Sequence, residues 1–285
     1  MNKIILSLII SANFGGLFAQ ESKSYDFSLY EKKMQVEGKD TLRYRILMPE
    51  KMEQGKKYPL FIFFHGVGES GNDNESQLKN CAFRFLEPDA RKNYPSIVIF
   101  PQMPARGRSG TPPSQPSRPA ASRTLVEVDA ADDASRLQRL NTPQVQMSLE
   151  LVRDMVLKSQ VDPDRVYIGG LSMGGMITYA ILSTYPDWFA AAVPICGRSS
   201  RQSVASWANK VPVWLFVGDE DEPFIEYNRD VDKILTLLRV GHKYTEYPGV
   251  GHNSWDPAFN EPDLLPWIFS NVKKGNIESF KKSSK

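Results

Sequence analysis

The sequence predicts a single α/β domain with a mostly parallel central sheet and helices on both faces. Three observations support this fold class. The 285 residues are enough for one large core. Short runs of β-branched and aromatic residues alternate with amphipathic helical stretches. The middle runs are apolar almost throughout, as expected for parallel strands that are covered on both faces.

The strands are expected where apolar runs are short and lie between turn residues. They are Thr41–Met48, Pro59–Phe64, Ser96–Phe100, Arg165–Gly169, Ala190–Ile195, Val211–Val217 and Lys243–Tyr247. Helices are expected where apolar residues recur every three to four positions. They are Val145–Lys158, Gly174–Tyr185, Asn228–Val240 and the short Leu264–Phe269. Gly241 then ends the third helix as a C′ glycine.

The first 19 residues have the pattern of a secretory signal peptide. Lys3 supplies a positive charge, Ile4–Ile10 is apolar, and polar residues follow Ala19. The apolar run is too short to span a bilayer comfortably. We therefore expect cleavage after Ala19, an exported (secreted or periplasmic) protein without an integral membrane span, and one α/β domain over residues 20–285.

A Pro-, Arg- and Ser-rich excursion at about residues 104–141 differs in composition from the rest of the chain. No lysine occurs between Asn93 and Leu157, although lysine is common elsewhere. This composition predicts a segment that is not a packed element. It leaves three interpretations open: a loop over a site, a disordered insertion, or a locally altered reading frame.

Charge and cysteine content exclude several function classes. Lys and Arg number 35 against 33 Asp and Glu, a formal net charge of +2, so no basic excess indicates nucleic-acid binding. Cys81 and Cys196 are too few for a zinc ribbon or a disulfide framework. We expect them to be buried free thiols, with a disulfide as the alternative. No zinc-ligand spacing, P-loop or Rossmann fingerprint is present, so neither a metal nor a nucleotide cofactor is expected.

Residues Gly170–Gly174, Gly-Leu-Ser-Met-Gly, are the strongest functional motif. They join the strand Arg165–Gly169 to the following helix. A nucleophile on such a tight turn needs small neighbours, because strand and helix crowd it. The alternative is a Gly-rich turn with a capping serine. The nucleophilic interpretation makes Ser172 the attacking residue and the Met173 N–H an oxyanion donor at the helix N-terminus.

A second glycine-rich turn, His65–Gly68, follows the buried strand Pro59–Phe64. An oxyanion hole in acyl transfer needs one donor beyond the nucleophile and one from an earlier loop. We expect the Val67 N–H to be that second donor, with the amides of Gly66 and Gly68 as alternatives. His65 is expected to hold the loop by hydrogen bonds rather than to act as a base.

The general base is expected at His252, in a Gly-rich loop after the last strand. His242 follows a helix end and is expected to be incidental. An orienting carboxylate should lie between nucleophile and base in the chain, and the four consecutive acids Asp219–Glu222 follow the strand Val211–Val217. The position of Trp255 beside His252 places this aromatic ring near the site.

Taken together, these motifs resemble secreted α/β-hydrolase esterases of the polyhydroxybutyrate-depolymerase, feruloyl-esterase and "predicted peptidase" type. The matching pieces are His65–Glu69, Gly71–Asn74, Phe100–Gln102, Gly170–Gly175, the pattern Gly218-x-x-Asp221 and Gly249–Trp255. The resemblance implies an α/β-hydrolase fold, selects Asp221 as the orienting acid, and places Gln102 and Trp255 at the substrate. The chain departs from the pattern at Ser70, where relatives often carry Arg, and lacks a Trp-bearing loop after Gln102.

The function implied is a secreted serine carboxylic-ester hydrolase that acts through an acyl-enzyme. The resemblance points to feruloyl, hydroxycinnamoyl or acetyl esters of plant polysaccharides, or to short-acyl esters. One alternative is a serine peptidase of the same fold. The other is a catalytically silent binding protein on a hydrolase-like fold, against which the intact Ser-Asp-His order speaks. The oligomeric state is left open.

Overall fold

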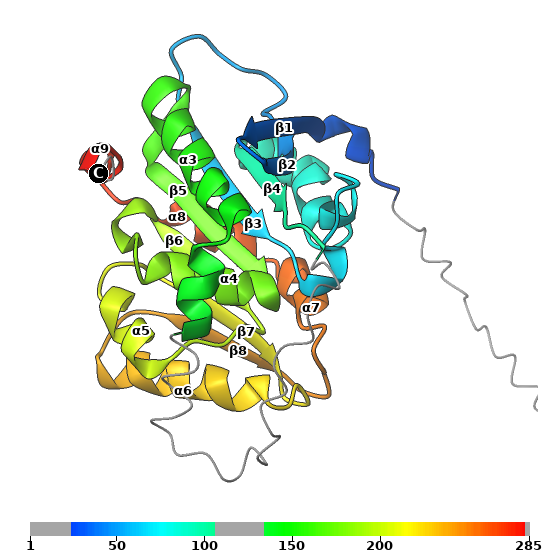
Figure 1. Cartoon of the computed structure of the whole chain (residues 1–285). Coiled ribbons are helices and arrows are strands. Elements are labelled where there is room, and N and C mark those ends of the chain that lie inside the picture. The colour runs from blue at the N-terminus through cyan, green and yellow to red at the C-terminus, as the bar shows by residue number, and fades with distance from the viewer. Residues whose placement is uncertain (1–23, 106–133, 283–285) are drawn as a thin grey trace, which may run out of the picture.

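A computed structural model describes residues 24–105 and 134–282 (Figure 1). The predicted signal peptide, residues 1–19, lies outside these ranges, and so does most of the predicted excursion. No helix in the described ranges is long and apolar enough to cross a membrane.

The described residues form an eight-stranded sheet in the order β1-β2-β4-β3-β5-β6-β7-β8. Pairing is antiparallel between β1 and β2 and between β2 and β4, and parallel from β4 through to β8. The strands are β1 (Glu31–Glu37), β2 (Asp40–Leu47), β3 (Tyr58–Phe64), β4 (Ile97–Gln102), β5 (Val161–Leu171), β6 (Ala191–Ile195), β7 (Trp214–Gly218) and β8 (Lys243–Tyr247). The prediction of a mostly parallel sheet is confirmed.

Helices cover both faces of the sheet, as predicted (Figure 1). One face packs against α3 (Pro143–Lys158), α4 (Met173–Leu182), α5 (Arg201–Trp207), α6 (Phe224–Leu237) and α9 (Ile277–Lys282). The other packs against α1 (Pro88–Asn93), α7 (Trp255–Asn260) and α8 (Leu264–Ser270). The middle strand β3 serves both faces. Leu60 and Ile62 belong to the first core cluster and Phe61 and Phe63 to the second, so this strand is apolar at every position.

All the predicted strands and helices exist, with ends shifted by a few residues. The sequence prediction missed β1 and the short helices α1, α5, α7 and α9. One expectation about the excursion is wrong. Residues 134–140 within it are helical, and Leu140 is only 6% exposed because it packs in the first core cluster. The C-terminal end of that segment is therefore a packed element.

Candidate active site

Ser172 lies on a sharp turn between β5 and α4, with a strained backbone at φ 53° and ψ −112°. The turn is possible only because its neighbours are glycines. A Cβ on Gly170 would lie 2.3 Å from the carbonyl oxygen of Gly174, and one on Gly174 would lie 1.9 Å from that of Phe64. The amide of Ser172 donates to Ile195 O at 2.9 Å, which ties the turn to β6. The turn presents a partly exposed hydroxyl at the carboxyl end of the sheet.

His252 reaches Ser172 from the loop between β8 and α7. Its Nε2 lies 2.8 Å from Ser172 Oγ, and its Nδ1 lies 2.9 Å from each carboxylate oxygen of Asp221. The His252 side chain is 40% exposed, whereas that of Asp221 is 4% exposed. A buried carboxylate, an imidazole and a hydroxyl therefore form one hydrogen-bonded chain that ends at the surface.

Only Asp221 of the four consecutive acids Asp219–Glu222 meets the imidazole. Asp219 has a different contact, because its Oδ1 accepts the Gly249 N–H at 2.7 Å. The two loops also lie in close contact at Gly218, where an added Cβ would meet Val250 O at 1.9 Å. Asp219 thus holds the loop that carries His252, and Asp221 holds the ring itself.

The two amides expected to face an oxyanion have no acceptor within the described part of the chain. Met173 begins α4, and Val67 begins a 3-10 turn, Val67–Glu69, so neither N–H has an intrahelical partner. A Cβ placed on Gly66 would lie 3.7 Å from Ser172 Cβ, so this turn lies beside the hydroxyl. The arrangement leaves two free donors near the same side chain.

His65 is buried and supports the turn, as the sequence predicts. Its Nε2 accepts the Met103 N–H at 2.9 Å, and its Nδ1 lies 2.6 Å from Gly66 O. Burial lowers the pKa of His65 to about 4, which keeps the ring neutral and able to accept from Met103. His242 bonds with Asp232 at 2.8 Å and with Val240 O instead. Of the three histidines, only His252 bonds with Ser172.

Gln102 is not open to a substrate, which corrects the expectation from the sequence. Its side chain is buried, with the residue 2% exposed, and its amide is engaged at both ends. Oε1 accepts the Asn74 N–H at 2.8 Å, while Nε2 donates to Asp73 Oδ1 at 2.7 Å and to Glu69 O at 3.2 Å. Gln102 therefore holds the loop that follows His65, because β4 ends beside β3.

Two aromatic rings flank the imidazole. Trp255 meets the His252 ring edge-on with centroids 5.7 Å apart, which agrees with its predicted position. Phe224, at the start of α6, lies 4.8 Å from the same ring and was not anticipated. Phe224 lies two positions after the acidic segment Asp219–Glu222, and this proximity is the sequence feature that could have placed it near the site.

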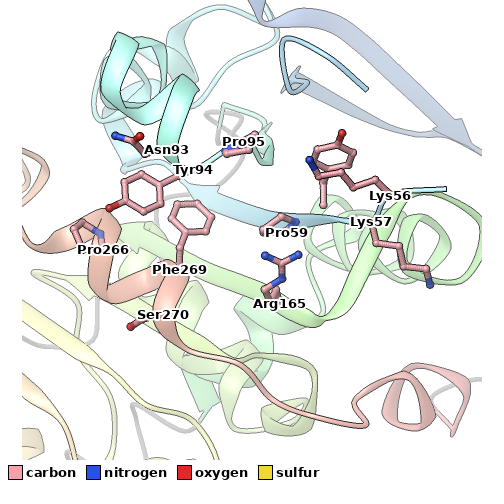
Figure 2. A pocket seen from close by; sticks show the side chains of 11 residues that line it. Lys56, Lys57, Pro59, Asn93, Tyr94, Pro95, Arg165, Pro266, Phe269 and Ser270 are labelled. Carbon is pink, nitrogen blue, oxygen red and sulfur yellow. The ribbon is translucent and has the colours of Figure 1, made fainter. Parts of the chain in front are cut away.

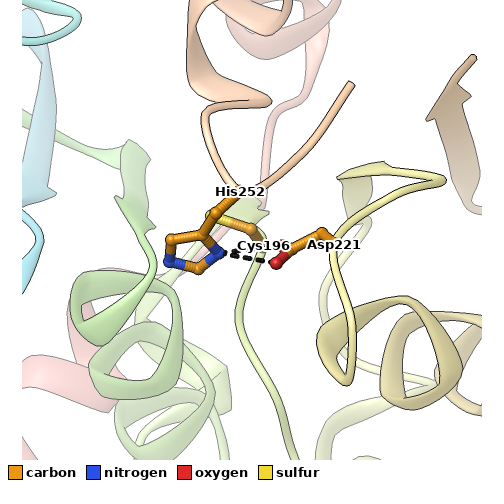
Figure 3. A group of neighbouring side chains, drawn as sticks. All are labelled: Cys196, Asp221 and His252. Atoms are coloured by element: carbon orange, nitrogen blue, oxygen red, sulfur yellow. Dashed lines mark hydrogen bonds and ion pairs between the residues drawn. The ribbon is translucent and has the colours of Figure 1, made fainter. Parts of the chain in front are cut away.

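Cys196 lies against Asp221 and His252 from the end of β6 (Figure 3). One ligand atom from each of the three side chains lies within 4.8 Å of the others, the spacing of a candidate metal centre. The donor set fits a metal poorly, since burial raises the pKa of the Cys196 thiol to about 12 and His252 is already bonded at both nitrogens. The sequence analysis did not predict this contact. Cys196 was nevertheless a candidate, because it follows β6, the strand that pairs with β5.

A cavity of about 470 Å³ lies at the opposite, amino-terminal ends of β3 and β5 (Figure 2). Tyr58, Arg165 and Phe269 are among its lining residues. Ligands of open α/β sheets bind beyond the carboxyl ends of the strands. The Ser172 edge therefore remains the candidate active site.

Comparison with known proteins finds sequence similarity to esterases and to a depolymerase. Over 48 residues, 17% of this chain and 12% of the relative, the sequence is 46% identical to poly(3-hydroxyalkanoate) depolymerase C of Paucimonas lemoignei. It is 24% identical over 67% of this chain to a probable SOBER1-like carboxylesterase of Arabidopsis thaliana, covering 71% of that protein. It is also 24% identical over 46% of this chain to feruloyl esterase B of Piromyces equi, covering 26% of it.

The crystal structure of a thermostable esterase superposes with a TM-score of 0.71 at 26% identity. The match covers 86% of this chain and 64% of that one. The chain thus spans less than two thirds of that esterase, of the depolymerase and of the feruloyl esterase.

The sheet order, the serine turn and the similarity to the esterase structure define an α/β-hydrolase fold. Residues 88–266 match the dienelactone hydrolase family, and the chain belongs to that family.

Proposed function

We propose that the protein is an exported serine hydrolase of carboxylic esters, with Ser172, His252 and Asp221 as its catalytic triad. The observation that carries the proposal is the unbroken chain of hydrogen bonds from Asp221 through His252 to Ser172 Oγ. Ser172 attacks the ester carbonyl while His252 Nε2 takes its proton. Asp221 holds the ring in the tautomer that accepts at Nε2, and stabilises the imidazolium that forms.

The oxyanion of the tetrahedral intermediate would be bound by the N–H groups of Met173 and Val67. Both donors are free in the described part of the chain, and α4 adds the positive end of its dipole. Collapse of the intermediate expels the alcohol, which receives the proton from His252. Water then takes the place of the alcohol. His252 removes a proton from the attacking water and gives it to Ser172 Oγ when the carboxylic acid leaves. No step in this scheme requires a cofactor.

The proposed substrates are short-acyl esters, or feruloyl and acetyl esters carried on plant polysaccharides. The similarity to a feruloyl esterase and the exposure of the His252 ring support bulky substrates. The partly buried ring of Trp255 is offered as the surface against which an aromatic acyl group or a sugar would stack. Export through residues 1–19 would bring the enzyme to such polymers.

A kinetic panel on the purified protein tests this specificity. The substrates are methyl ferulate, acetylated xylan, p-nitrophenyl esters of rising chain length, and aminoacyl p-nitroanilides. We expect the highest kcat/KM on a hydroxycinnamoyl or short-acyl ester, at least ~100-fold above any anilide, which corresponds to about 2.7 kcal/mol of transition-state binding. If the kcat/KM on an anilide equalled that on the best ester, the esterase proposal would be wrong and the protein would be a peptidase.

A further inference from the structure

Glu69 ends the turn that offers the Val67 N–H, and its side chain folds back toward Ser172. The carboxylate oxygen Oε2 lies 3.1 Å from the position that a Cβ on Gly66 would take, and Ser172 Cβ lies 3.7 Å from the same position. Leu171 Cδ1 is nearer still, at 2.7 Å. Only a glycine at position 66 leaves room for these groups, so the carboxylate packs between the turn and the nucleophile.

The two oxygens of the Glu69 carboxylate have different surroundings. Oε1 accepts a hydrogen bond from Asn80 Nδ2 at 3.2 Å. Oε2 is buried and has no hydrogen-bond partner in the part of the chain that the structure describes. A substrate does not reach a buried oxygen, so Glu69 is neither a base nor a nucleophile. Any effect of Glu69 on the reaction therefore passes through the residues packed around it.

The turn itself helps to balance the charge of this carboxylate. Burial raises the pKa of the Glu69 carboxyl. The backbone N–H groups of Gly66 and of Glu69 itself oppose this rise in pKa, and so do Lys79 and Asn80. The two N–H groups belong to the turn, so they stabilise the carboxylate only while the turn keeps its present shape. The carboxylate and the turn amides thus favour one mutual arrangement.

Other side chains hold the two ends of the turn more firmly than its middle. At the start of the turn, Gly66 O lies 2.6 Å from His65 Nδ1. At its end, Gln102 Nε2 donates to Glu69 O at 3.2 Å. In the middle, Val67 is 58% exposed and gains little support from packing. The Glu69 side chain supplies the contact toward the nucleophile that the middle of the turn lacks.

We propose that Glu69 is a positioning residue of the oxyanion hole, whose carboxylate fixes the turn so that the Val67 N–H stays directed at the oxyanion. The inference rests on the proposed function and adds a residue to its site. An oxyanion donor contributes fully only when it is held in place before the charge develops. Loss of one donor lowers kcat about 10²–10³-fold, and a donor that is present but poorly held should cost less.

Three substitutions at Glu69 separate its length from its charge. Glu69→Ala removes both, Glu69→Asp keeps the charge on a shorter side chain, and Glu69→Gln keeps the length and an acceptor without the charge. With p-nitrophenyl acetate, we expect Glu69→Ala and Glu69→Asp to lower kcat about 30-fold and Glu69→Gln to lower it less than about fivefold. KM should change less than about twofold in all three, because the oxyanion forms only on the way to the intermediate.

Inhibition by phenylboronic acid gives a readout that a mere loss of folded protein would not change. The boronate forms a tetrahedral adduct on Ser172, and one of its oxygens takes the place of the oxyanion. We expect its inhibition constant to rise about tenfold or more in Glu69→Ala, with activity referred to the sites that a fluorophosphonate probe labels. An inhibition constant that stays at the wild-type value while kcat falls would overturn the positioning role.

Glu75→Ala is the matched control. Glu75 follows Glu69 in the chain, but it is exposed and pairs with Lys32. We expect its kcat and KM to stay within about twofold of wild type. Thermal melts identify any variant that does not fold, and Glu69→Asp and Glu69→Gln carry the test if Glu69→Ala is lost in this way. Wild-type kcat in Glu69→Asp would overturn the inference, and so would a loss in Glu69→Gln as large as about 30-fold.

Failure of the inference about Glu69 is distinguishable from failure of the proposed function. Wild-type protein that hydrolyses p-nitrophenyl acetate, beside a Glu69→Ala variant with unchanged kcat, would defeat the inference about Glu69 alone. Wild-type protein that hydrolyses no ester of the panel and takes up no fluorophosphonate would defeat the proposed function, and the inference about Glu69 with it.

Discussion

At the scale of single residues, the two aspartates that follow β7 have different roles around His252. Asp221 contacts the His252 ring, and Asp219 contacts the backbone of its loop. We expect Asp221→Asn to lower kcat about 10⁴-fold, since an amide favours the wrong imidazole tautomer. Asp219→Asn should lower it far less. Steady-state kinetics of both variants on p-nitrophenyl acetate make the test, and a reversed order of effects would make Asp219 the orienting acid.

His65 should make stability depend on pH. Its folded pKa of about 4 lies below the ordinary value of 6.5. Between these values the unfolded chain binds a proton that the folded chain does not, so the free energy of unfolding falls as pH falls through this window, by about 3 kcal/mol in all. Urea unfolding at pH 7 and pH 4.5 measures the loss. His65→Gln should show a smaller loss, and an unchanged loss in that variant would assign the effect to other groups.

Ser172 and His252 were candidates from the sequence because each lies in a short local motif. Residue types alone did not choose among the four acids Asp219–Glu222, since the choice depends on which side chain the loop turns toward His252. Gln102 was placed at the substrate by the family resemblance alone, and the sequence did not reveal its buried contacts. Its partners Asp73 and Asn74 belong to a distant loop, and hydrogen bonds between segments cannot be read from either segment alone.

At the scale of elements, the junction of β5 and α4 depends on a missing side chain. An added Cβ at Gly174 would overlap Phe64 O at 1.9 Å, backbone that cannot move without breaking β3. We expect Gly174→Ala to destabilise the fold by more than about 3 kcal/mol or to prevent folding. Gly68→Ala is the control, since nothing lies within 4 Å of its Cβ position. Thermal melts compare the two, and equal melting temperatures would contradict the tight junction.

Buried strands were predictable because their apolar runs are continuous, whereas β1 was not. The sequence of β1 is Glu-Lys-Lys-Met-Gln-Val-Glu, and all its residues are exposed at the edge of the sheet. Only pairing with β2 makes it a strand. The helix at residues 134–140 was not predicted, because the segment around it is rich in Pro, Arg and Ser. Leu140 packs in the first core cluster and so holds this helix against the core.

At the scale of the whole molecule, both cysteines belong to the core cluster beneath α7 and α8. Cys81 is 1% exposed and Cys196 is 0% exposed, and both are free. Burial raises the pKa of both thiols, which slows their reaction further. We expect Ellman's reagent to find almost no reactive thiol in the native protein and two after unfolding in guanidinium without reductant. A count below two after unfolding would show that the cysteines pair.

The central claim is that Ser172 is the nucleophile of a working triad. The most direct measurement is intact-mass analysis after treatment with a fluorophosphonate probe, followed by peptide mapping. We predict one adduct per chain, on Ser172, in step with loss of esterase activity. Ser172→Ala should fold, take up no probe and lose roughly 10⁶-fold in kcat. A folded wild-type protein that takes up no probe, or an adduct that persists in Ser172→Ala, would contradict the account.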